Sequence, residues 1–170
     1  MLPAKISALI RDSIDVYLKA QGYRTARFGQ RLLAQSFAGQ TIQPAKVAAV
    51  TAKEIEAVSI GLVTAIKSVI EKFQINPYVG LESDLLAVFD SDFDKCAEAI
   101  QKFGRDTFTR LHANDSSSNW FTHRLEDARK ARHVEIRLLA AEISKSNSGN
   151  TNRVLYNSDN EPVGIVDSDT

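Results

Sequence analysis

The longest regular hydrophobic pattern in the chain lies between residues 51 and 73. Apolar or small residues recur there every three or four positions, which places them on one face of an α-helix: Ala52, Ile55, Val58, Ser59, Leu62, Val63, Ile66, Val69, Ile70 and Phe73. A second row contains only small residues, where another backbone could approach closely: Ala57, Gly61, Ala65 and Ser68. Such a helix is typical of the centre of a bundle or of half an oligomer interface. We therefore predict an all-α bundle around a central helix over about residues 51–74.

The start of the central helix has two interpretations. Pro44 suits the first turn of a helix, whereas Thr51 with Glu54 three residues later has the pattern of a capping box. The helix either begins at Pro44 or begins again at Thr51 after a bend. Its end is clearer, because Pro77 disfavours helical geometry in the residue before it.

Shorter patterns predict the other elements of a bundle of five or six helices. We expect them between Pro3 and Gly22, over about 25–38, over 83–89 as a short helix or turn, from an Asp90 or Ser91 cap to about 111, and over about 120–144. The inward side of the last helix is predicted to consist of Phe121, Leu125, Ala128, Val134, Leu138 and Ala141, with Ile136 as a further candidate.

The end of the chain has a different character. Residues 145–152 are rich in Ser and Asn and read as a flexible linker. Two apolar runs then flank a turn-forming segment over 157–162, which predicts a β-hairpin. We therefore divide the chain into a helical bundle domain over 1–145 and a linker with a hairpin or flexible tail over 146–170. An isolated hairpin is marginal in water, so its apolar residues either bind another chain, fold back on the bundle or stay disordered: Leu155, Tyr156, Ile165 and Val166.

Composition and charge narrow the class of protein without naming a partner. The 170 residues are 44% hydrophobic, which is typical of a globular domain, and 21 basic residues balance 21 acidic ones. The single cysteine, Cys96, excludes an internal disulfide framework and every multi-cysteine metal site; its place in an apolar stripe predicts a buried thiol. No run of 18 apolar residues and no secretory leader is recognisable. We therefore expect a cytoplasmic protein without a membrane span.

A basic row on the second predicted helix suggests nucleic-acid binding as an alternative function. Arg24, Arg27 and Arg31 stand three and four positions apart, and Lys19 lies across the turn at Gly22. Such a row could contact phosphates in a helix-turn-helix arrangement. The competing interpretation is a solvated face, or salt bridges to the acidic stretch after residue 80.

The acidic stretch does not form a calcium loop. Asp90, Asp92 and Asp94 alternate like the start of one, but Lys95 and Gln101 stand where the loop glycine and the bidentate glutamate belong. We therefore interpret these aspartates as helix caps and predict neither a metal nor a cofactor.

Candidate catalytic residues are few. His123 has Glu126 and Asp127 one helical turn later, so a small hydrolase or transferase using His123 as general base is a third hypothesis. No phosphate loop, dinucleotide fingerprint or zinc-ligand pair is present.

Trp120 is interpreted as a core anchor or as an exposed interface residue. The leading prediction is a non-enzymatic protein-interaction module, acting as an adaptor, assembly or regulatory factor and self-associating.

Overall fold

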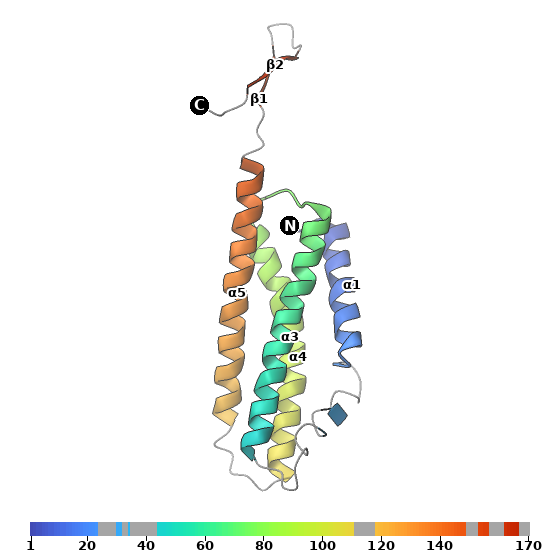
Figure 1. Cartoon of the computed structure of the whole chain (residues 1–170), viewed down its shortest axis with the longest axis vertical. Coiled ribbons are helices and arrows are strands. Elements are labelled where there is room, and N and C mark those ends of the chain that lie inside the picture. Colours follow the sequence, from blue (N-terminus) through green and yellow to red (C-terminus); the bar gives the residue numbers. More distant parts are fainter. Residues whose placement is uncertain are drawn as a thin grey trace.

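The computed structural model of the chain describes residues 1–23, 30–31, 34, 44–110, 118–148, 153–156 and 162–166. Four long helices run through the described residues (Figure 1): α1 (Ala4–Ala20), α3 (Pro44–Phe73), α4 (Leu81–Arg110) and α5 (Ser118–Ser148). Helix α3 packs against each of the other three, and α4 also packs against α5. The predicted all-α class is thus confirmed, with α3 in the centre. The helix expected over 25–38 falls largely outside the described residues.

Helix α1 follows the sequence prediction closely. It begins directly after Pro3, whose carbonyl accepts the backbone N–H of Ser7. Its buried residues are Ile10, Ile14 and Leu18, which stand four positions apart on one face. Gly22 follows the helix with a φ of 70°. That left-handed conformation costs glycine little and ends the helix.

Helix α3 is continuous from Pro44, so the predicted start at Thr51 is wrong. The Thr51 side chain is buried inside the helix, and its hydroxyl donates to the Val47 carbonyl oxygen at 2.7 Å. This bond to the residue four positions earlier satisfies the hydroxyl without a cap. Glu54, the supposed capping partner, instead accepts a hydrogen bond from the hydroxyl of Tyr23.

The predicted inward face of α3 is confirmed over most of its length. Its large apolar residues from Ile55 to Ile70 are buried, whereas Phe73 at the helix end is 40% exposed. The small-residue row also admits a close approach, but by a side chain rather than a backbone. A Cβ on Gly61 would lie 1.9 Å from Cζ of Tyr17, and the Tyr17 hydroxyl donates to the Ala57 carbonyl oxygen at 2.9 Å.

Helix α4 is a single helix, so the predicted break near Asp90 is wrong. Leu85, Phe89 and Phe93 are buried four positions apart along one uninterrupted stripe. The rings of Phe89 and Phe93 stack with centroids 5.2 Å apart. Because one stripe crosses the supposed boundary, 83–89 and 90–111 form one element. The count of five or six helices was too high for this region.

The predicted inward face of α5 is partly wrong. Val134 is 53% exposed and Leu138 is 59% exposed, whereas Ala128 is buried as predicted. Ile136, the further candidate, is also buried, as are Leu139, Ala140 and Ile143, which were not predicted to face inward. Val134 and Leu138 lie on the opposite side of the helix from this buried stripe. A charged residue, Arg132, stands in the middle of that stripe with little exposure. The helix also continues to Ser148, into the predicted linker.

The chain continues beyond α5 into two short strands (Figure 1). Strand β1 (Arg153–Tyr156) pairs antiparallel with β2 (Pro162–Val166), and the register shifts between Leu155 and Tyr156. Binding of another chain by the hairpin residues stays a prediction.

Among the described helices, none combines the length and the apolar character needed to span a membrane.

Candidate interaction surfaces

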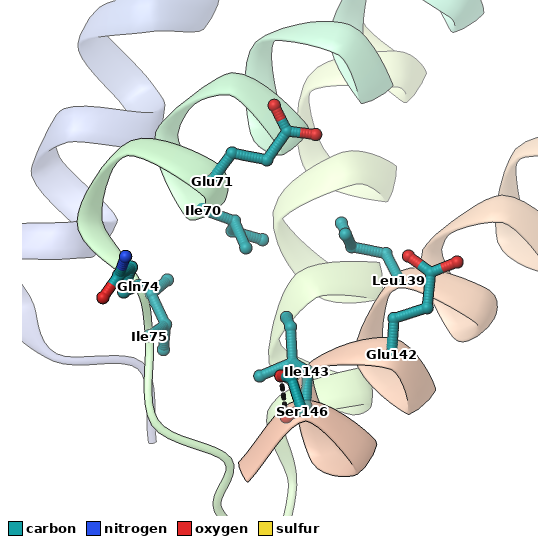
Figure 2. Close-up of a pocket in the computed structure, with 8 residues that line it drawn as sticks. All are labelled: Ile70, Glu71, Gln74, Ile75, Leu139, Glu142, Ile143 and Ser146. Carbon is teal, nitrogen blue, oxygen red and sulfur yellow. Dashed lines mark hydrogen bonds between the residues drawn. The ribbon is translucent and has the colours of Figure 1, made fainter. Parts of the chain in front are cut away.

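A groove of about 440 Å³ lies between the C-terminal parts of α3 and α5 (Figure 2). We call it the α3–α5 groove. Its lining consists of Ile70, Glu71, Gln74, Ile75, Leu139, Glu142, Ile143 and Ser146. The isoleucines and Leu139 are almost fully buried and form the floor, whereas the polar residues are exposed at the rim.

The end of α3 has a local geometry that completes this groove. Gln74 adopts a positive φ of 43°, and its backbone N–H donates to the Ile70 carbonyl oxygen at 3.0 Å. This left-handed residue reverses the chain direction after the helix. Ile75 is thereby buried at the groove floor instead of continuing along the helix axis.

The rim of the groove is acidic. Glu71 extends from α3 and Glu142 from α5, on two sides of the apolar floor in Figure 2. No lysine, arginine or histidine belongs to the lining. Within the described part of the chain, neither carboxylate forms an ion pair with another side chain. The groove therefore combines apolar surface with uncompensated negative charge.

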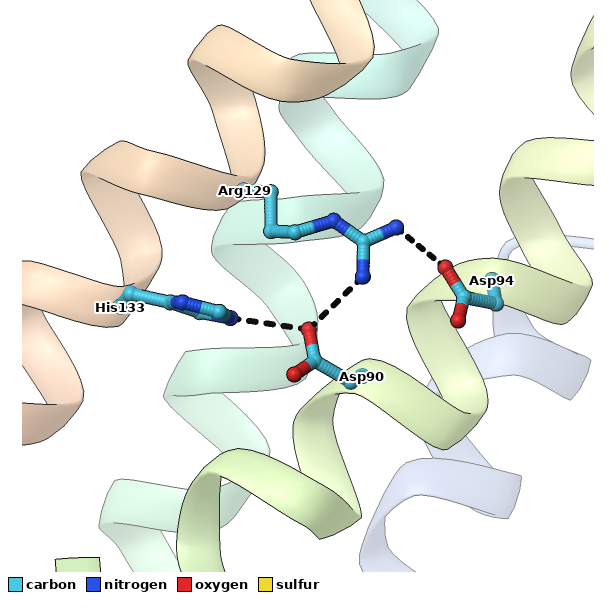
Figure 3. A network of polar contacts seen from close by, with 4 residues as sticks. All are labelled: Asp90, Asp94, Arg129 and His133. Carbon is cyan, nitrogen blue, oxygen red and sulfur yellow. Dashed lines mark hydrogen bonds and ion pairs between the residues drawn. The ribbon is translucent and has the colours of Figure 1, made fainter. Parts of the chain in front are cut away.

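A second polar cluster joins α4 to α5 (Figure 3). The guanidinium of Arg129 donates to Asp90 at 3.0 Å and also contacts Asp94, while Nε2 of His133 lies 2.8 Å from Asp90. Phe89 presents an edge-to-face contact to the His133 ring at 5.9 Å between centroids. Each charged group in this cluster has a partner, so the arrangement ties two helices together rather than presenting a free acid or base.

The cluster also corrects the predicted role of the aspartates. Asp90 and Asp94 were interpreted as caps, but both lie inside α4 and face α5. They stand four positions apart on one helix face, which lets a single arginine bridge them. Sequence spacing on α4 alone could not identify this arginine, because Arg129 lies 35 residues beyond Asp94.

A third cluster joins the end of α1 to α3. Glu54 accepts hydrogen bonds from the Tyr23 hydroxyl at 2.8 Å and from the Arg31 guanidinium at 3.2 Å. Arg31 also donates to the Gln21 carbonyl oxygen at 2.7 Å and lies over the ring of Tyr23. The Glu54 side chain is almost buried. The cluster therefore holds the chain after α1 against the central helix.

This third cluster predicts an alkaline loss of stability. Burial, together with the hydrogen bond to Glu54, raises the pKa of Tyr23 above its ordinary value near 10. The folded state thus holds the phenol proton more tightly than the unfolded chain does. Its contribution to stability is complete below about pH 10 and decreases as the pH rises further. Urea unfolding between about pH 9 and pH 11 should show this decrease, and Tyr23→Phe should make it less steep. An equal slope in both proteins would contradict the assignment.

The predicted nucleic-acid row is only partly within the described residues. Arg24 and Arg27 lie outside them, and Lys19 is exposed in the last turn of α1. Arg31 is half-buried and directs its guanidinium to Glu54 and to the Gln21 carbonyl oxygen. Arg31 therefore has an intramolecular role that the sequence did not indicate.

The candidate catalytic residues lie on the open surface of α5. His123, Glu126 and Asp127 are all exposed, so they lack the water-excluded setting in which acid–base catalysis is most effective.

Cys96 is buried, as predicted. In the described ranges, no three His, Cys, Asp or Glu residues come close enough to hold a metal ion. Trp120 lies in the first turn of α5, and its role as core anchor or interface residue stays a prediction.

Sequence reasoning missed the α3–α5 groove altogether. Glu71 and Glu142 are separated by 71 positions and belong to no recognisable motif. Only the apolar stripe of α3 indicated that Ile70 would face a neighbouring helix.

Comparison with known proteins does not indicate a function, because no family model, curated protein or solved structure matches the chain.

Proposed function

We propose that this protein is a non-enzymatic protein-interaction module whose α3–α5 groove holds a lysine or arginine side chain of a protein partner. One observation supports the proposal above all others. Two exposed carboxylates, Glu71 and Glu142, flank an apolar floor whose lining contains no basic side chain. A ligand that suits this surface must combine apolar and cationic parts.

Lysine and arginine side chains have this combination. Their methylene stems cover apolar surface while the charged heads remain in contact with water. In the groove, the stem would lie along Ile70, Leu139 and Ile143, and the head would donate charge-assisted hydrogen bonds to the two carboxylates. Arginine is also among the residues that contribute most to protein interfaces. An acidic partner segment would be repelled by the same rim.

The two walls of the groove are held together before any partner binds. Lys67 of α3 lies 3.7 Å from Glu135 of α5, and Arg132 of α5 lies 3.5 Å from Glu56 of α3. Because buried side chains also fill the space between these helices, little ordering remains to be done on binding. Such preorganisation favours affinity.

Methyl NMR on isoleucine-labelled protein tests the proposal. A blocked Leu-Arg-Leu peptide should shift the methyl signals of Ile70, Ile75 and Ile143, while Ile60, on the far side of α3, should not move. A blocked Leu-Glu-Leu peptide should leave all four signals unchanged. Equal shifts with both peptides would show that the groove does not select a cation.

Matched carboxylate variants locate the interaction. The double substitution Glu71→Gln with Glu142→Gln should weaken binding of the arginine peptide about tenfold, since it removes both charged acceptors without changing shape. Glu98→Gln, at an exposed carboxylate of α4, is the control and should leave the affinity unchanged. Undiminished binding by the double variant would exclude this groove.

A further inference from the structure

Helix α5 has a second apolar stripe on the side opposite its buried face. The stripe consists of Ala131, Val134, Leu138 and Ala141, all exposed. The intervals between them are three, four and three residues, the spacing of the contact positions in a coiled coil. We call this the outer stripe. In Figure 1, α5 forms one edge of the bundle, with its outer side free of other described helices.

Charged residues border the outer stripe in two rows of opposite sign. Lys130 and Arg137 lie along one edge, seven positions apart. Glu135 and Glu142 lie along the other edge, also seven positions apart. These are the flanking positions of a heptad repeat, where charges decide which helix pairs with which and in which direction.

We propose that the outer stripe binds the outer stripe of a second copy of this chain, with the two α5 helices parallel. In that arrangement the basic row of one helix faces the acidic row of the other. Lys130 then lies near Glu135 of the partner subunit, and Arg137 lies near Glu142 of the partner subunit. The two-fold symmetry repeats both pairs, so four attractive contacts border the apolar stretch. The face is thus complementary to itself.

An antiparallel arrangement fits the charges less well. It places Glu135 near its own copy and Arg137 near its own copy, directly beside the apolar contacts. Its attractive contacts are limited to Asp127 with Lys145, beyond the two ends of the stripe, where the parallel arrangement brings each of these two residues near its own copy. Charges beside the apolar contacts are less hydrated than charges beyond the ends of the stripe, so they interact more strongly. The parallel arrangement is therefore favoured.

The flanking charges also have partners within the subunit. Arg137 lies 3.2 Å from Glu82, and Glu135 lies 3.7 Å from Lys67 and 3.1 Å from Arg132. The Arg137–Glu82 pair is solvent-exposed and therefore weak, so Arg137 can exchange it for a contact across the dimer. Glu135 keeps its contact with the nearly buried Arg132 and shares its carboxylate with Lys130 of the partner subunit. The apolar stretch covers only three turns, which makes the expected dimer a weak one that dissociates at low protein concentration.

This inference is independent of the proposed groove function. Glu142 borders both surfaces, so the variants used for the dimer leave Glu142 unchanged. Loss of self-association with retained binding of the arginine peptide, or the reverse, separates the two proposals.

Sedimentation equilibrium on the full chain tests the association. The average mass should rise towards that of a dimer with increasing concentration. Val134→Lys should weaken dimerisation at least about tenfold, because it places a charge in the middle of the stripe. Val79→Lys is the matched control, since Val79 is a fully exposed valine in the turn before α4. The dissociation constant of the dimer should be the same in this variant as in the original protein. Circular dichroism verifies that both variants remain helical. A monomer at every concentration, or equal effects of both variants, would overturn the proposal.

Disulfide cross-linking tests the orientation. In a Cys96→Ala background, Ala141→Cys should form a covalent dimer on mild oxidation, because this position meets its own copy in a parallel pair. When the Ala131→Cys and Ala141→Cys proteins are mixed, each should cross-link mainly to its own copy and not to the other variant. Preferential mixed cross-links would indicate antiparallel helices and overturn the parallel assignment.

Discussion

Replacing Ile66 by alanine is expected to lower the free energy of unfolding by about 2–5 kcal/mol. Ile66 lies in the middle of α3 and is fully buried, at 0% exposure. Because α3 contacts α1, α4 and α5, the truncation leaves a cavity where the helices meet. Urea unfolding followed by circular dichroism measures the loss.

The same helix supplies a matched control. Ile60 is 46% exposed, so Ile60→Ala removes the same atoms from a partly hydrated site. We expect a loss of less than about 1 kcal/mol there, since much of its apolar surface already contacts water. If both alanine variants lost equal stability, α3 would not be covered on the side that the structure shows.

Replacing Glu54 by alanine is expected to lower the free energy of unfolding by about 2–3 kcal/mol. The substitution removes the acceptor of two donors, the Tyr23 hydroxyl and the Arg31 guanidinium. Donors that lose their partner in a partly buried site keep the cost of desolvation without its compensation. Thermal or urea unfolding near neutral pH measures the loss.

Two further substitutions distinguish this explanation from a general effect of lost charge. Glu54→Gln keeps an oxygen acceptor for Tyr23 and should lose less stability than Glu54→Ala. Glu71→Ala, at an exposed glutamate of the same helix, should change stability by no more than about 0.5 kcal/mol. A large effect of Glu71→Ala would indicate that charge on α3, rather than the bonds at Glu54, decides stability.

The helices that sequence periodicity identified best are α1 and α3. In both, apolar residues at intervals of three and four continue without a charged residue among them. Gly22 marks the end of α1 for a local reason, its φ of 70°. Periodicity and turn chemistry are properties of a short stretch of chain, so they can be read without knowledge of the partner helices.

The errors on α4 and α5 have a common origin in charged residues. Asp90 suggested a helix start because aspartate is a good cap, yet its carboxylate is occupied by Arg129 and His133 of another helix. Arg132 concealed the true inward face of α5, because a charged residue is rarely expected in a buried stripe. Its guanidinium reaches Glu56 of α3 and Glu135 of its own helix.

The sequence alone determined that this chain is helical, where α1 ends and which face of the central helix is covered. The tertiary structure decided which of two apolar faces of α5 turns inward, which charge pairs with which, and where Glu71 meets Glu142 across a groove. The physical reason is the range of the interactions. A helix forms through contacts three and four residues apart, whereas ion pairs and grooves depend on which helices come together.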